Sequence, residues 1–172
     1  MENHKVEDIV NLNTIWPLPK NKIPIVIIGA GGIVSDAHLP AYKKANFKVI
    51  GIYDPDENKA KECANKFSID KIYSSEEEAF NEDNVIFDIA VPPQVLLSVV
   101  KKIPENSICQ LQKPMGNSME EAKEIKELIK SKNITACVNL QLKFSPMMIA
   151  LQEAINKKMI GTITELEISL SV

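Results

Sequence analysis

Few residues of this chain could hold a metal ion or cross-link its segments. The 172 residues include three cysteines and two histidines. Cys63, Cys109 and Cys137 share no short spacing, and His4 and His38 lie far apart in the sequence, so the clustered ligands of a structural zinc site are missing. The odd number of cysteines suits a reducing compartment. We therefore expect no metal site.

Long apolar runs and an excess of positive charge are missing as well. Runs such as Ile25–Ile28 are far too short to span a bilayer, and residues 1–21 contain no apolar stretch of signal-peptide length. The formal net charge is −3, and the lysines are scattered among glutamates. A basic surface for nucleic acid is therefore not expected. We expect a cytoplasmic protein with neither a membrane nor nucleic acid as partner.

Apolar runs of strand length alternate with amphipathic segments through most of the chain. We expect strands at about 24–29, 48–53, 70–73, 85–91, 107–111 and 134–138. We expect helices at about 32–45, 57–67, 76–81, 93–102 and 118–132, the last capped by Ser118 with Glu121 three residues on. This alternation predicts an α/β fold, a doubly wound (Rossmann) and mostly parallel six-stranded sheet.

Both ends of the chain depart from this alternation. Residues 1–22 are interpreted as an N-terminal extension that closes on Trp16-Pro17-Leu18-Pro19, with one short helical turn near residues 6–12. Residues 23–140 form the predicted nucleotide-binding domain. Residues 141–172 are expected to hold a linker, a helix over 146–158 and a half-buried strand over 163–172, the start of an incomplete α+β domain. Because the alternation is still running at Val172, we expect the front part of a longer protein, or one that another chain completes.

A glycine-rich turn follows the first predicted strand, in the segment Gly29-Ala30-Gly31-Gly32-Ile33-Val34. Gly29 permits a tight turn, and Gly31 lets the backbone approach a pyrophosphate that lies over the start of the next helix. The third position of the dinucleotide-binding pattern is Val34, which is bulkier than the glycine or alanine usually found there. A glycine turn without a ligand is the alternative interpretation.

Asp54 ends the second predicted strand, close to the spacing of about 20 residues at which an acidic residue binds the adenosine ribose. A carboxylate there accepts hydrogen bonds from the ribose hydroxyls and repels a 2′-phosphate. NAD is therefore favoured over NADP. The alternative is that Asp54-Pro55-Asp56 is a turn and a helix cap.

Two further segments fall where ligands bind open α/β sheets, at the carboxyl ends of the strands. Val91-Pro92-Pro93 follows the fourth predicted strand, and Gln112-Lys113-Pro114 follows the fifth. A lysine at this edge can hydrogen-bond a substrate hydroxyl and hold positive charge as a hydride leaves the carbon. Taken alone, Lys113 would be interpreted as a solvated surface lysine.

Several segments in order resemble the Gfo/Idh/MocA oxidoreductase family, over about residues 23–172. They are the glycine turn with His38-Leu39-Pro40-Ala41, Ile52-Tyr53-Asp54-Pro55, Gln112-Lys113-Pro114-Met115-Gly116, and Val138-Asn139-Leu140-Gln141-Leu142-Lys143-Phe144-Ser145-Pro146. The resemblance implies an NAD(P)-dependent oxidoreductase that acts on a sugar, cyclitol or polyol. Another Rossmann ligand, such as S-adenosylmethionine, would not explain why these segments occur together.

The resemblance also assigns residues to a site. Lys113 corresponds to the lysine of a Glu-Lys-Pro motif beside the nicotinamide and the substrate, and it is the predicted catalytic residue, with Lys143 also near the substrate. Predicted cofactor contacts are Gly29, Gly31, Gly32, Ile33, Asp54, Val91, Pro92, Gln112 and Gln141. Three positions depart from the family pattern: Gln112 replaces a glutamate, Lys143 an arginine, and Leu96 a histidine.

One element of the family pattern is absent from the chain. Members usually carry an Asp-x-x-x-His arrangement in the second domain, and this sequence has no histidine after His38. We interpret His38 as a packing or positioning residue rather than a general base. The chain is therefore expected to be a catalytically incomplete portion. The alternative is a non-catalytic module that binds a nucleotide or a partner and forms a homo-oligomer through the strand at 163–172.

Overall fold

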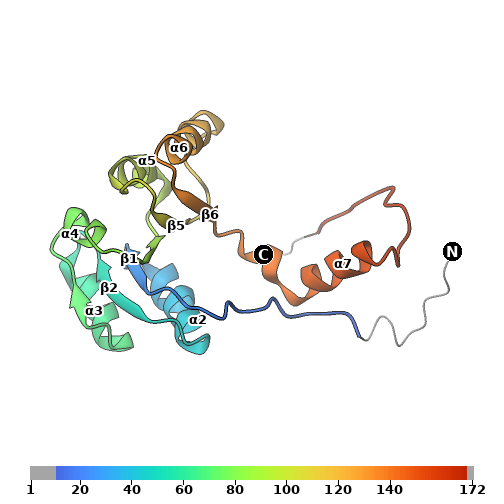
Figure 1. Cartoon of the computed structure of the whole chain (residues 1–172), viewed down its shortest axis with the longest axis horizontal. Coiled ribbons are helices and arrows are strands. Elements are labelled where there is room, and N and C mark those ends of the chain that lie inside the picture. Colours follow the sequence, from blue (N-terminus) through green and yellow to red (C-terminus); the bar gives the residue numbers. More distant parts are fainter. Residues whose placement is uncertain (1–10, 170–172) are drawn as a thin grey trace. The chain divides into compact units, whose positions relative to one another are not determined.

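The computed structural model describes residues 11–169 of the chain (Figure 1). The chain consists of two compact units. One, which we call the sheet unit, is Pro19–Asn139, and the second combines the segment up to Leu18 with the segment from Leu140 onward. The helical turn predicted near residues 6–12 falls largely outside the described residues. Between residues 11 and 169, none of the helices has the length and apolarity that crossing a membrane requires.

Six parallel strands form the core of the sheet unit, in the order β3-β2-β1-β4-β5-β6. They are β1 (Ile25–Ile28), β2 (Val49–Tyr53), β3 (Lys71–Ile72), β4 (Ile86–Ile89), β5 (Ile108–Leu111) and β6 (Thr135–Val138). The order reverses between β1 and β4, so that loops leaving these two strands diverge to opposite sides. The doubly wound sheet predicted from the sequence is confirmed.

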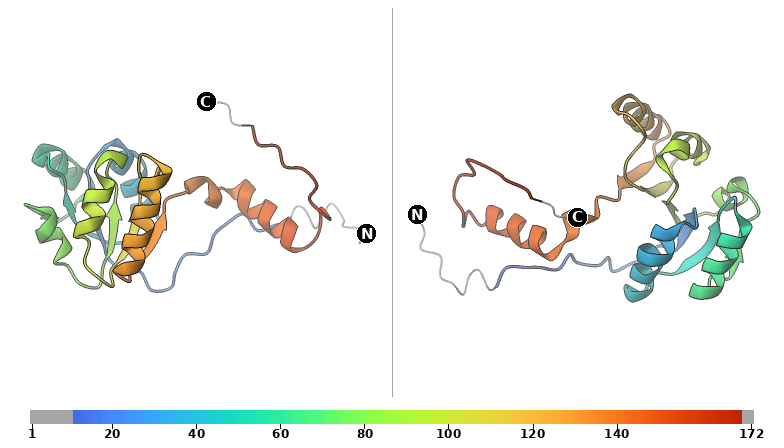
Figure 2. Two further views of the ribbon diagram at one scale, coloured as in Figure 1. Left: turned by 90° about the horizontal axis from the view of Figure 1, so that it is seen from above. Right: turned by 180° about the vertical axis from the view of Figure 1, so that it is seen from behind.

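Helices cover the sheet on both faces because the strand side chains alternate. On β1, Val26 and Ile28 pack in one buried cluster with Leu96 and Ile125. Ile25 and Ile27 belong to the cluster on the other face. The helices are α2 (Leu39–Lys44), α3 (Glu57–Phe67), α4 (Glu76–Phe80), α5 (Pro93–Lys102) and α6 (Met119–Ser131). Figure 2 shows the yellow-green α5 and the orange α6 side by side on one face.

The helix after the glycine turn differs from the single helix predicted over 32–45. Its first part, η1 (Val34–His38), is a π-helical turn in which the Leu39 N–H donates to the Val34 carbonyl, five residues back. Pro40 has no N–H to donate to the preceding turn, and the wider turn accommodates this break in the hydrogen-bond ladder. The π-helical turn buries Val34 and His38.

The second unit contains a short 3₁₀ turn, η2 (Gln141–Phe144), and the helix α7 (Pro146–Asn156). The helix predicted over 146–158 is confirmed, and the Ser145 hydroxyl caps it by accepting the Met148 N–H. The Trp16 and Phe144 rings meet edge to face, with centroids 5.3 Å apart. The Asn13 N–H donates to the Glu153 carboxylate.

The strand predicted over 163–172 is wrong for its described part. Residues 163–169 have no regular secondary structure, and residues 170–172 lie outside the described part of the chain. Alternation of side chains makes a strand only where another strand supplies backbone partners. No described strand pairs with this segment, and Leu166 and Ile168 remain 71% and 78% exposed.

Candidate functional site

The glycine turn depends on a backbone conformation at Gly29 that other residues rarely adopt. This residue has φ +106, and a Cβ atom built on it would lie 2.5 Å from the Ala90 carbonyl oxygen. Only glycine combines that backbone angle with so close an approach. A Cβ on Gly31, by contrast, would meet nothing within 4 Å. The turn predicted at Gly29 and the open approach predicted at Gly31 therefore both occur.

Asp54 is hydrogen-bonded to this turn. Its Oδ2 accepts the Ala30 N–H at 2.6 Å, and its Oδ1 accepts the Asp56 N–H at 2.8 Å. Asp56 caps α3 by accepting the Asn58 N–H. The turn-and-cap alternative thus describes Asp56, whereas Asp54 links the end of β2 to the loop after β1. Each Asp54 oxygen keeps a further lone pair for a hydroxyl donor.

The carboxyl ends of β1, β4 and β5 meet at the same edge of the sheet. The Ala90 N–H donates to the Ile28 carbonyl, and the Gln112 N–H donates to the Ile89 carbonyl. Val91 and Pro92 therefore follow β4 beside the glycine turn, with Gln112 and Lys113 one strand further along. The Lys113 side chain is exposed, and the peptide bond between Lys113 and Pro114 is cis.

A hollow of about 260 Å³ opens beside the glycine turn. The turn and Ser35 of η1 form one wall, and residues of α3 form the other. The lining residues are Ala30, Gly31, Gly32, Ser35, Lys59, Glu62, Cys63 and Lys66. The helix that starts at this hollow presents backbone N–H groups without intrahelical partners, which favours an anion there.

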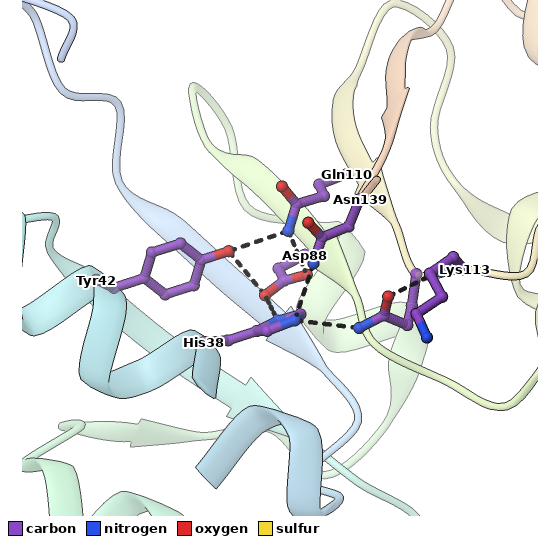
Figure 3. A network of polar contacts seen from close by, with 7 residues as sticks. His38, Tyr42, Asp88, Gln110, Lys113 and Asn139 are labelled. Atoms are coloured by element: carbon purple, nitrogen blue, oxygen red, sulfur yellow. Dashed lines mark hydrogen bonds and ion pairs between the residues drawn. The ribbon is translucent and has the colours of Figure 1, made fainter. Parts of the chain in front are cut away.

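A buried polar network lies beneath the same edge (Figure 3). Asp88 on β4 is completely buried and His38 is 6% exposed, with 2.7 Å between the Asp88 Oδ2 and the His38 Nδ1 atoms. The His38 Nε2 atom lies 3.1 Å from the Gln112 Nε2 atom and 3.2 Å from the Asn139 Nδ2 atom. The Gln112 Oε1 atom accepts the Lys113 N–H at 2.8 Å. A chain of hydrogen bonds thus runs from the core to Lys113.

Tyr42 and Gln110 complete the surroundings of Asp88. The Tyr42 hydroxyl donates to Asp88 Oδ2 at 2.9 Å, and the Gln110 amide donates to Asp88 Oδ1 at 3.3 Å. Burial, together with the negative charge of Asp88, raises the pKa of the Tyr42 phenol well above its usual range. Tyr42 therefore stays protonated and serves as a donor.

Comparison with known proteins identifies the family to which this chain belongs. A model of the Gfo/Idh/MocA family, described as an oxidoreductase family with an NAD-binding Rossmann fold, matches residues 23–140. The chain belongs to this family.

Similar proteins span more than this chain does. It is 30% identical over 147 residues to the trans-1,2-dihydrobenzene-1,2-diol dehydrogenase of Mus musculus, covering 83% of this chain and 43% of that protein. It is 32% identical over 106 residues to the redox-sensing transcriptional repressor Rex of Thermosipho africanus, covering 60% of this chain and 47% of Rex. The chain spans less than half the length of these curated relatives.

A solved structure shows the same fold. The structure of an oxidoreductase from Agrobacterium radiobacter, in complex with NAD+, L-tartaric acid and magnesium, superimposes with a TM-score of 0.72 at 21% identity. The match covers 83% of this chain and 42% of that one. The Rossmann fold of this Gfo/Idh/MocA member is thus shared with an enzyme that carries NAD+.

NAD is the cofactor of this domain, and the residues of the Gfo/Idh/MocA site fit it. The space over Gly31 is open where a pyrophosphate needs close access to the backbone. Asp54 lies at the end of β2 with free lone pairs, where a ribose carries hydroxyl donors. Ile33 is 46% exposed at the start of the helix, beside the turn.

Two predicted site residues, Gln141 and Lys143, lie in the second unit. Both belong to the 3₁₀ turn η2 and are exposed. Their roles at the cofactor and substrate stay predictions, whereas Gly29, Asp54, Val91, Gln112 and Lys113 share one edge of the sheet unit.

Sequence reasoning missed Asp88, Tyr42 and Gln110. A signal for Asp88 was present, because a carboxylate inside the apolar run Val85–Ile89 implies a buried and partnered charge. Nothing in the spacing of Tyr42 or Gln110 indicated that they would reach it. Parallel pairing of β4 with β5 places Asp88 opposite Gln110, and helix α2 brings in Tyr42.

Proposed function

We propose that this chain supplies the NAD-binding part of an oxidoreductase that acts on a CH–OH carbon of a sugar, cyclitol or polyol. The observation that carries this proposal is the shared edge of the sheet, where Asp54 is hydrogen-bonded to the glycine turn and Lys113 follows β5, two strands from β1. Membership of the Gfo/Idh/MocA oxidoreductase family supports it. The three free cysteines fit a reducing cytoplasm.

Each residue of the proposed site has a role. NAD, when bound, supplies the nicotinamide that accepts or donates the hydride. The N–H groups of Gly31, Gly32 and Ile33 would bind the pyrophosphate, and Asp54 the ribose hydroxyls. Val91 and Pro92 would flank the cofactor beside Gly29, where the Val91 side chain lies 3.6 Å from the position of a Cβ atom built on that glycine.

Lys113 is the proposed catalytic residue. Its ammonium group would donate to the substrate oxygen and stabilise the charge that develops there during hydride transfer. Its exposed side chain is available to a substrate, and its backbone is held by Gln112. Gln141 and Lys143 would contribute further contacts to the cofactor and to the substrate.

NADH binding to this chain tests the cofactor site. Protein-bound NADH fluorescence should rise and saturate with the unmodified chain. Gly31→Trp would fill the open space over the turn and should abolish saturable binding. Lys126→Trp, on the exposed face of α6, is the matched control and should bind normally. Equal affinity of the Gly31→Trp variant and the control would refute the site.

Hydride transfer tests the catalytic role. The chain should reduce NAD slowly with some member of a panel of sugars, cyclitols and polyols, because its sequence holds no histidine after His38 to act as the second proton-transfer group. Lys113→Gln should lower that rate by about 100-fold or more, as expected for loss of a group acting in proton transfer. NADH affinity should change little. Equal turnover by Lys113→Gln and the unmodified chain would reject the catalytic role of Lys113.

A second candidate function is a regulatory module that binds the cofactor without turnover. The similarity to the redox-sensing repressor Rex favours it. Light scattering separates the two candidates when combined with the hydride-transfer assay. A stable oligomer that binds NADH and oxidises no polyol would favour the regulatory module, and measurable turnover would favour the enzyme.

A further inference from the structure

The Gln112 side chain has one orientation that satisfies its neighbours. Its Oε1 atom accepts the N–H of Lys113, and a nitrogen in that place would face another donor. The Gln112 Nε2 group is therefore directed at His38, 3.1 Å from the His38 Nε2 atom. The hydrogen bond from the Lys113 N–H thus determines that the Nε2 group of Gln112, and not its Oε1 atom, faces His38.

This orientation also fixes the tautomer of His38. Its Nε2 atom faces two amide N–H donors, Gln112 and Asn139, so it must be the acceptor. The ring hydrogen is then on Nδ1 and is donated to Asp88 Oδ2 across 2.7 Å. Tyr42 and Gln110 donate to the same carboxylate. In the described part of the chain, no buried side-chain nitrogen or oxygen lacks a hydrogen-bond partner.

A proton on Nε2 would disrupt this arrangement. It would place three N–H donors against one another, because Gln112 and Asn139 already point at that atom. Gln112 would then have to rotate its amide to offer Oε1 to His38. The Lys113 N–H would lose its acceptor, and the backbone that carries the Lys113 side chain would be released.

We propose that His38 is a positioning residue for Lys113. Held by Asp88 with its hydrogen on Nδ1, it orients the Gln112 amide, and that amide anchors the Lys113 backbone at the edge of the sheet. Its importance for catalysis rests on the proposed function, whereas the hydrogen-bond chain itself can be tested without turnover. Neither His38 nor Asp88 contacts the substrate in this scheme.

Imidazole nitrogen NMR of the full chain tests the tautomer directly. The chain has two histidines, so the spectrum of a His4→Gln variant contains His38 alone. We expect the shift pattern of a neutral ring with hydrogen on Nδ1. A ring with hydrogen on Nε2 would overturn the proposal, and this measurement needs no change within the network.

The Lys113 backbone amide provides the second readout. His38→Asn retains a donor near Asp88 and removes the acceptor for Gln112. It should shift the Lys113 amide resonance and raise its hydrogen-exchange rate by roughly three- to tenfold, as expected for loss of one hydrogen bond. Tyr42→Phe is the matched control, because it removes a donor to the same carboxylate without touching Gln112. Its Lys113 amide should keep the unmodified exchange rate.

The outcomes distinguish this proposal from the proposed function. An unchanged Lys113 amide in a folded His38→Asn variant, or equal changes in both variants, would show that His38 only supports the core. Should His38→Asn fail to fold, the tautomer measurement decides. Absence of NADH binding by the unmodified chain would reject the proposed function and leave the NMR result on the hydrogen-bond chain valid.

Discussion

At the scale of single residues, neighbouring glycines of one motif carry different constraints. Gly29 is required by the fold, since its φ is positive and a Cβ atom would collide with the Ala90 carbonyl. Gly31 has open space around it and no such requirement. A sequence motif lists the two glycines alike, whereas the structure shows that the fold requires only Gly29 to be glycine, and we propose that Gly31 serves the ligand.

Replacing each glycine by alanine should separate these effects. Gly29→Ala should lower the free energy of unfolding by about 2 kcal/mol or more, through backbone strain and the clash with Ala90. Gly31→Ala should leave stability nearly unchanged and weaken NADH binding, because the methyl group occupies the approach to the backbone. Urea denaturation and NADH fluorescence measure the two effects. A strongly destabilised Gly31→Ala variant would contradict this division.

Because of Tyr42, we expect the free energy of unfolding to decrease at alkaline pH. Burial and Asp88 raise the pKa of its phenol in the folded state, so the folded protein holds this proton more tightly than the unfolded chain. The stabilisation is complete below about pH 10, the ordinary tyrosine value, and is lost as the pH rises beyond it. Melting temperatures measured from pH 9 to pH 11 should fall less steeply for Tyr42→Phe. Parallel curves for the two proteins would refute this.

Residues with local signals could be predicted, and residues joined only by the fold could not. The glycine turn, Asp54 and Lys113 each follow a recognisable strand end, and all three lie at the predicted sheet edge. His38, Asp88 and Gln110 come from η1, β4 and β5, and Asn139 follows β6. Their hydrogen bonds depend on strand order and register, which no local pattern specifies.

At the scale of elements, α6 shows how a predicted cap differs in detail from the observed one. The Ser118 hydroxyl accepts the Glu121 N–H at 3.1 Å, which confirms the predicted N-cap. The Glu121 carboxylate reaches Asn117 instead of the Ser118 N–H, and it accepts both the backbone and the side-chain N–H of Asn117. These hydrogen bonds lower the pKa of Glu121. The start of α6 is thereby joined to the loop after Gly116.

Removing this cap should weaken the fold by a predictable amount. Ser118→Ala deletes the acceptor of the Glu121 N–H and should lower the free energy of unfolding by about 1 kcal/mol. Ser118→Asp restores an acceptor and should remain close to the unmodified chain. Urea denaturation followed by circular dichroism measures both. Equal losses for alanine and aspartate would show that the hydroxyl does not cap the helix.

The periodicity of apolar residues predicted correctly those elements that pack against other predicted elements. Helices α3, α5 and α6 agree with their expected ranges because their apolar stripes face strands of the same domain. The π turn before Pro40 was missed, since the period of the apolar residues does not reveal one extra residue in a turn. The strand at 163–172 was wrong over 163–169 because alternation says nothing about the presence of a pairing strand.

At the scale of the whole molecule, the buried core is concentrated in the sheet unit. Within residues 11–169, all strands and both buried clusters lie between Pro19 and Asn139. The second unit leaves large apolar side chains exposed, among them Trp16, Leu140, Phe144 and Met147. Little apolar area is therefore available to stabilise that unit.

The two units should unfold at different concentrations of urea. Trp16, the single tryptophan, contacts Phe144 and so reports on the second unit, whereas most of the circular dichroism comes from the sheet unit. We expect the fluorescence transition to precede the circular dichroism transition. Phe144→Ala should move the fluorescence transition alone. Coincident transitions in the unmodified chain would contradict two separate units.

The hydrogen bond between Asp54 and Ala30 has a consequence for the rate and strength of cofactor association. It joins the carboxylate proposed to bind the ribose to the turn proposed to bind the pyrophosphate, with 2.6 Å between the Ala30 nitrogen and Asp54 Oδ2, so both are ordered when the chain folds. A preorganised pair of loops loses little conformational entropy when a ligand arrives. Association should therefore be a single fast phase in stopped-flow fluorescence, without a slower ordering step.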